Sequence, residues 1–79
     1  MTRKLYEIGT EIYYDWKKPY FGAVPYLDAL IDLNDITDQY GCDSAESIVA
    51  YFLSNANTWK GETARRVKKE LNAMLKAAK

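Results

Sequence analysis

The chain has 79 residues, with eleven basic and eleven acidic side chains, so its formal net charge is zero. It has no histidine and a single cysteine, Cys42, which removes the commonest general base, a disulfide and a Cys/His zinc site. No stretch approaches the roughly 20 apolar residues that cross a membrane, and a lone cysteine suits a reducing cytoplasm. We therefore expect one cytoplasmic domain over residues 1–79, with no cofactor, no metal ion and no membrane contact.

The charges are unevenly distributed along the chain. Residues 1–59 carry four basic and nine acidic side chains, a net charge of −5, whereas residues 60–79 carry seven basic and two acidic ones, a net charge of +5. Such a split is typical of electrostatic recognition of a partner, and equally of attraction between two layers of one fold. The sequence leaves both interpretations open.

The first half of the chain predicts two helices. Apolar side chains recur at helical spacing over residues 3–16, and Gly9 within this stretch would let another helix approach closely. Residues 17–24 form a connector whose aromatic pair, Tyr20 and Phe21, we expect to fold back onto the core. A second helix is predicted over residues 26–40, with Gly41 after its last turn.

The second half also predicts two helices. Asp43 and Glu46 have the spacing of a capping box, which predicts a helix start, and a broad apolar face follows up to Ala56. A regular apolar stripe predicts the last helix over residues 60–78. No segment shows the alternation of a strand. The fold class is therefore all-α, a small four-helix domain with the third helix central.

The first candidate site is an acidic side of the second predicted helix. Its carboxylates recur every three or four residues, and two apolar side chains beside them could anchor a partner. The alternative is a solvated helix face. The proposed partner-binding residues are Asp28, Asp32, Asp35, Leu27 and Ile31, extended by Glu7, Glu11 and Asp15 of the first helix.

The second candidate site is the basic side of the last predicted helix. Clustered cations could contact a nucleic-acid backbone, although lysines near a helix C-terminus are also favoured by the helix dipole. The residues are Arg65, Arg66, Lys68 and Lys69. In the joint before them, Trp59 is either a lid on the core or an exposed anchor.

No constellation of catalytic side chains is present, since no histidine is available to activate a serine. We therefore expect no enzymatic activity.

Three segments resemble small proteins carried by phages and mobile genetic elements of Gram-positive bacteria. They are residues 15–27 (DWKKPYFGAVPYL), 51–56 (YFLSNA) and 59–64 (WKGETA). No activity is established for that group, so the resemblance implies a setting, the bacterial host cytoplasm, and a role in contact with the host. Short phage proteins without enzymatic activity often act by blocking a host machine.

The sequence therefore favours a non-enzymatic protein-binding module that inhibits a host protein, in counter-defence, through its acidic helical face. The partner would be a host or phage protein. The alternative is a nucleic-acid-binding helical protein that uses its basic C-terminal helix. A homodimer that covers its own apolar surface is a third interpretation.

Overall fold

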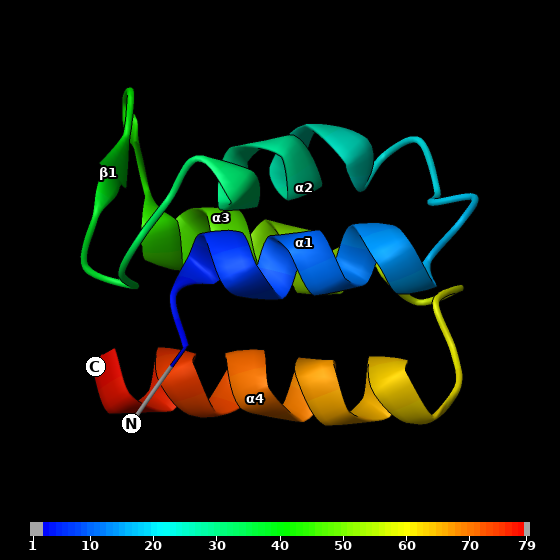
Figure 1. Cartoon of the computed structure of the whole chain (residues 1–79). Coiled ribbons are helices and arrows are strands. Elements are labelled where there is room, and N and C mark those ends of the chain that lie inside the picture. The colour runs from blue at the N-terminus through cyan, green and yellow to red at the C-terminus, as the bar shows by residue number, and fades with distance from the viewer. Residues whose placement is uncertain (1–2, 79) are drawn as a thin grey trace.

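The computed structural model describes residues 3–78, which form four helices and one short hairpin (Figure 1). In chain order the elements are α1 (Leu5–Asp15), α2 (Val24–Ile31), β1 (Gln39–Tyr40), β2 (Asp43–Ser44), α3 (Ala45–Ser54) and α4 (Glu62–Ala78). The predicted class, a small and mostly α-helical four-helix domain, is confirmed.

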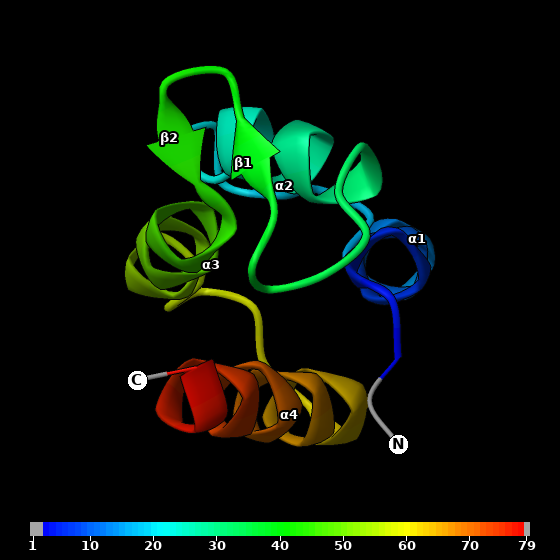
Figure 2. The ribbon, with the colours of Figure 1, turned by 90° about the vertical axis from the view of Figure 1, so that its left-hand side faces the viewer.

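The helices form a ring around the core when they are viewed end-on (Figure 2). Both α1 and α3 pack against α2 and against α4. The third helix is therefore no more central than the first, because the core lies between all four helices rather than around α3. None of the helices formed by residues 3–78 is long and apolar enough to cross a membrane.

The core contains the apolar stripes predicted for the first, third and fourth helices, whereas α2 contributes Leu27, Ala29 and Leu30 rather than the longer stripe that was predicted for it. Gly9 of α1 lies against α2, where an added Cβ would come 3.1 Å from the Ile31 side chain and 3.3 Å from that of Leu30. This confirms the predicted close approach of a second helix. The largest fully buried side chains are Trp59, Phe52, Leu5, Ile8, Ile12, Leu27, Leu30, Leu71, Val49 and Val67.

The second helix is much shorter than predicted. It ends at Ile31, and the chain then turns so that the carbonyls of Leu33 and Asn34 accept the backbone N–H groups of Tyr6 and Leu5. The first N–H groups of a helix have no partner within it. The start of α1 therefore binds these two carbonyls, which would otherwise accept hydrogen bonds from a continued second helix. The Asp38 carboxylate accepts both the Asn34 and Asp35 N–H groups at 3.0 Å, which stabilises the turn.

A two-stranded antiparallel hairpin follows where no strand was expected. Gln39 pairs with Ser44, and Tyr40 pairs with Asp43. Gly41 has a φ of +61°, as glycine does in the first central position of a type II′ hairpin turn. Its role is therefore to turn this hairpin rather than to end a helix.

The start of α3 also differs from the prediction. Ser44, rather than Asp43, is the N-cap residue, and its hydroxyl accepts the Ser47 N–H at 3.1 Å. Asp43 instead belongs to β2, so its carboxylate is not part of a capping box. The helix begins at Ala45, within two residues of the predicted start.

Candidate functional site

Two segments far apart in the sequence meet at one end of the molecule. The connector that follows α1 and the joint between α3 and α4 lie at the same end of the helices in Figure 1. Trp16 from the connector stacks on Trp59 from the joint, with ring centroids 5.7 Å apart and an interplanar angle of 14°. The Trp59 indole N–H donates to the Asp15 carboxylate at 2.8 Å. Trp59 is therefore a lid on the core, one of the two alternatives given by the sequence.

This end of the molecule is strongly basic. We define the basic end as residues 16–25 and 54–69, which carry seven cations and the acid Glu62, a net charge of +6; the Asp15 carboxylate, which accepts the Trp59 indole N–H, borders it. Residues 26–53, in contrast, carry six acids and no lysine or arginine. The fold thus gives the molecule a charge asymmetry in space, although its net charge is zero. The cations are Lys17, Lys18, Lys60, Arg65, Arg66, Lys68 and Lys69.

The joint and the first turns of α4 enclose a shallow hollow within this end. The hollow has a volume of about 330 Å³, and its cationic lining is Lys60, Arg65 and Lys68, with Asn57 at its edge. Lys60 and Arg65 are exposed, and within residues 3–78 neither forms an ion pair. Their charges are therefore available to an anionic partner.

Lys68 has a structural partner as well. Its ammonium donates to the Trp59 carbonyl at 2.6 Å and lies 5.9 Å from the centroid of the Trp59 ring. Partial burial, together with the nearby charge of Lys60, lowers the pKa of Lys68 below its ordinary value. A negative charge bound in the hollow would counter the repulsion between Lys60 and Lys68.

The aromatic pair of the connector is exposed, contrary to the prediction that it folds back onto the core. Phe21 is 79% exposed and Tyr20 is 45% exposed, and their ring centroids lie 4.8 Å apart. The stacked rings of Trp16 and Trp59 cover this end of the core instead. The basic end therefore presents two aromatic rings to solvent among its cations.

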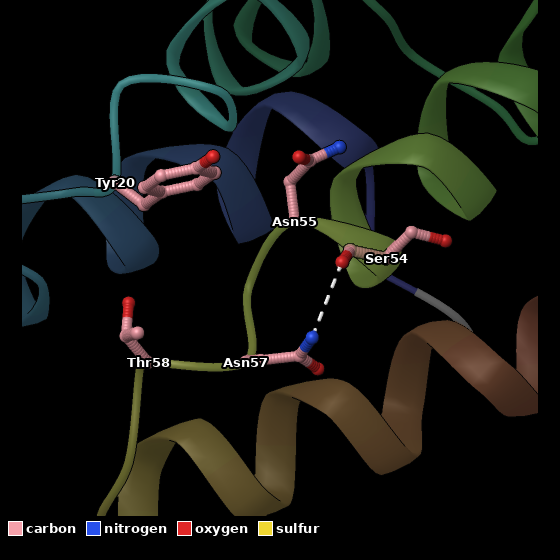
Figure 3. Close-up of a pocket in the computed structure, with 5 residues that line it drawn as sticks. All are labelled: Tyr20, Ser54, Asn55, Asn57 and Thr58. Atoms are coloured by element: carbon pink, nitrogen blue, oxygen red, sulfur yellow. Dashed lines mark hydrogen bonds between the residues drawn. The ribbon is translucent and has the colours of Figure 1, made fainter.

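A second hollow lies between Tyr20 and the C-terminal end of α3 (Figure 3). It has a volume of about 280 Å³. In Figure 3 the Tyr20 ring lies on one side of the hollow, and the Thr58 hydroxyl points towards it. The Asn57 amide donates to the Ser54 carbonyl at 3.5 Å. The lining residues are Tyr20, Ser54, Asn55, Asn57 and Thr58.

The acidic candidate site is not assembled as the sequence predicted. Leu27 is fully buried in the core, so the prediction that it anchors a partner is wrong. Ile31 is half-buried with its side chain towards Gly9. Only Asp28 lies within α2, since Asp32 is its C-cap and Asp35 lies beyond it in the following turn.

Most of these carboxylates also serve contacts inside the molecule. The Tyr13 hydroxyl donates to Asp28, which raises the pKa of Tyr13. The Lys4 ammonium lies 3.1 Å from the Asp35 carboxylate, and this contact raises the pKa of Lys4. Glu7 accepts the Lys4 backbone N–H at 2.8 Å. Asp32 remains exposed, and no ion pair or side-chain hydrogen bond involves it within residues 3–78.

The basic candidate residues divide into two groups. Arg65 and Lys69 are exposed on the outer face of α4. Arg66 points the other way and donates to Glu11 of α1. Arg3 joins the same cluster, 2.8 Å from Glu11 and 2.7 Å from Glu70. Some of the unevenly distributed charges therefore attract each other across the contact between α1 and α4, which is one of the two interpretations that the sequence left open.

The Glu11 cluster predicts how stability depends on acid. The hydrogen bond from Arg66, with a further one from Arg3, lowers the pKa of Glu11 below its ordinary value of 4.5. A carboxylate with a lowered pKa stabilises the fold above its unfolded pKa, and this contribution is lost as pH falls through the folded value. We expect Glu11→Gln to cost about 1 kcal/mol at pH 7, because the contacts are partly exposed. Urea unfolding at pH 7 and pH 3 should show a smaller loss of stability with acid in Glu11→Gln than in the wild type; equal losses would contradict the assignment.

Several residues of the basic end were not predicted from the sequence. Lys17, Lys18 and Lys60 were not assigned to a site, and neither were the polar residues of the second hollow. The available signal was compositional, since segments 16–25 and 54–69 each hold only cations apart from Glu62. Their convergence becomes visible only in the fold.

Comparisons of the chain with protein-family models, with curated proteins and with solved structures found no match. The resemblance to proteins of phages and mobile elements therefore stays a prediction. Within residues 3–78, no three His, Cys, Asp or Glu side chains are grouped so that they could hold a metal ion.

Proposed function

We propose that this protein binds nucleic acid through its basic end. The observation that carries the proposal is the convergence of the connector and the start of α4, which brings the exposed cations Lys17, Lys18, Lys60 and Arg65 to the same end of the molecule as the exposed rings of Tyr20 and Phe21. Clustered lysine and arginine side chains attract a phosphate backbone and release its condensed counterions. Exposed aromatic rings beside cations are typical of surfaces that bind single-stranded nucleic acid.

The arrangement along α4 supports the same function. Arg65, Lys69 and Lys76 are exposed and lie on one face of the helix, because they are separated by four and seven residues. With a rise of about 1.5 Å per residue, they span roughly 16 Å. A phosphate backbone that leaves the basic end could therefore continue along the outer face of α4.

A second candidate is the protein-binding module that the sequence favoured. Residues 26–53 carry six acids and no cation, and Asp32 and Asp43 are exposed among them. This surface suits a protein with a basic groove, such as a host nucleic-acid-binding protein that the module would inhibit. Leu27 is removed from that site by its burial, so any contact would rest on charge.

The test of the proposed function compares two substitutions on the same helix. Arg65→Gln and Lys76→Gln each remove one exposed cation, one at the basic end and the other in the last turns of α4. An exposed ion pair is worth up to about 1 kcal/mol, so Arg65→Gln is expected to weaken the binding of a fluorescein-labelled 12-nucleotide DNA about two- to fivefold. Lys76→Gln is expected to have a smaller effect.

Fluorescence anisotropy at about 50 mM salt would measure both affinities. Equal affinity of Arg65→Gln and the wild type would contradict a site at the basic end. A larger loss in Lys76→Gln than in Arg65→Gln would place the contact at the other end of α4.

A further inference from the structure

We infer that the hollow beside Tyr20 accepts one unpaired base, so that the protein prefers single-stranded nucleic acid over a duplex. This inference rests on the proposed function and specifies its substrate class. The shared chemistry is an unpaired base with its phosphates, in DNA or in RNA.

The lining of the hollow suits the edge and the face of a base. Its volume of about 280 Å³ is at the small end of ligand pockets, which suits a single ring system. Thr58, Asn55 and Asn57 line it, and the Thr58 hydroxyl, which points towards the Tyr20 ring in Figure 3, makes no hydrogen bond to another group within residues 3–78. These groups can pair with the donors and acceptors on the edge of a base.

Tyr20 supplies an aromatic face next to these polar groups. Its ring borders the hollow and is 45% exposed, and the Phe21 ring beside it is 79% exposed. Bases stack on such rings whatever their sequence, because every base has a π-face. A paired base is already stacked within its duplex, so it would first have to leave the stack.

The neighbouring cations place the backbone. Asn57 lines both the hollow beside Tyr20 and the hollow formed by Lys60, Arg65 and Lys68. A base held beside Tyr20 would therefore put its own or the next phosphate within reach of those cations. Stacking and charge neutralisation would act on adjacent parts of one strand.

The experiment uses the full chain and four labelled probes in an anisotropy titration. The probes are a 12-nucleotide oligo-dT, the same length of oligo-U, a 12-base-pair duplex, and a 12-nucleotide strand whose central sites are abasic. We expect both base-bearing single strands to bind at least tenfold more tightly than the duplex. Stacking is worth about 5- to 150-fold in affinity per base, so the abasic strand should lose at least fivefold.

Two variants test the hollow itself. Tyr20→Ala removes the stacking ring. Gly22→Ala keeps every polar group, but its Cβ would lie 2.6 Å from a Tyr20 ring carbon and 2.9 Å from the Asn55 side-chain oxygen, so both must move. Each variant is expected to lose fivefold or more on oligo-dT. The matched control is Tyr40→Ala, which removes a tyrosine of similar exposure, 40%, from the hairpin at the opposite end.

The outcomes separate the inference from the proposed function. Loss of affinity in Tyr20→Ala and Gly22→Ala, with circular dichroism unchanged and Tyr40→Ala unaffected, would support the base site. The contrary result is that the single strand, the duplex and the abasic strand bind with equal affinity, which salt weakens and Tyr20→Ala does not change. That result would overturn the base site but leave the proposed function standing. Absence of binding to all four probes would overturn both.

Discussion

Replacement of Trp59 by alanine is expected to cause the largest stability loss of any single substitution considered for this protein. Trp59 is 2% exposed, stacks on Trp16 and forms a T-shaped pair with Phe52, with ring centroids 6.4 Å apart. Truncation of a buried tryptophan costs about 3–5 kcal/mol, since the cavity is only partly filled by relaxation. A chain of this length has a total stability of about 4–12 kcal/mol. Trp59→Ala should therefore lose at least about a quarter of this stability, and it would be largely unfolded at 37 °C if the wild type lies at the lower end of the range.

Urea unfolding followed by circular dichroism measures this effect. Trp59→Phe is the control, because it keeps an aromatic ring against Trp16 but loses the hydrogen bond to Asp15. We expect it to cost less than half as much as Trp59→Ala. If Trp59→Ala lost less than about 1 kcal/mol, Trp59 would not be the lid that joins the connector to the joint, and the assembly of the basic end would need another explanation.

Reversal of two charges at the basic end is expected to abolish most nucleic-acid binding. Lys60→Glu and Arg65→Glu together would lower the net charge of the basic end from +6 to +2. Both side chains are exposed and border the same hollow, so the two new carboxylates would repel phosphate where the wild type attracts it. We expect an affinity loss of at least tenfold in anisotropy at 50 mM salt, since each reversal is worth more than the loss of one exposed ion pair. Stability should change by less than about 0.5 kcal/mol per site.

A compensated variant is the control for the protein's overall charge. Adding Asp32→Lys and Asp43→Lys returns the net charge to zero without changing the basic end. If binding depends on the charges of the basic end itself, this quadruple variant is expected to bind nucleic acid as weakly as the double variant. Recovery of wild-type affinity would show that overall charge, and not this surface, determines binding.

The sequence predicted the helices best where an apolar stripe alone decides the structure. The stripes of α1 and α4 placed both helices within two residues of their observed ends. The stretch after Ile31 was predicted wrongly because tertiary contacts decide its structure. The carbonyls of Leu33 and Asn34 accept N–H groups at the start of α1, and the Asp38 carboxylate, which lies outside any helix, accepts the Asn34 N–H.

The candidate site was predictable only in part, for a related reason. The cations of α4 were identified from their spacing, and Arg65 and Lys69 are indeed exposed. Their position at the same end of the molecule as Lys17 and Tyr20 depends on the path of the chain, which brings together segments 45 to 52 residues apart. The burial of Leu27 likewise depends on how α2 is turned towards α1, which a short, mostly apolar helix does not reveal.

The salt dependence of oligonucleotide binding tests the central claim most directly. Single strands lose affinity with a log–log slope of about −0.7 per phosphate neutralised. Engagement of three to five cations of the basic end therefore predicts a slope between about −2 and −4 for oligo-dT between 50 and 200 mM salt. A slope in that range would support the account. A slope near zero would contradict it. Absence of binding at about 0.1 mM protein in 50 mM salt would also contradict it, because such an affinity is weaker than ordinary non-specific binding to nucleic acid.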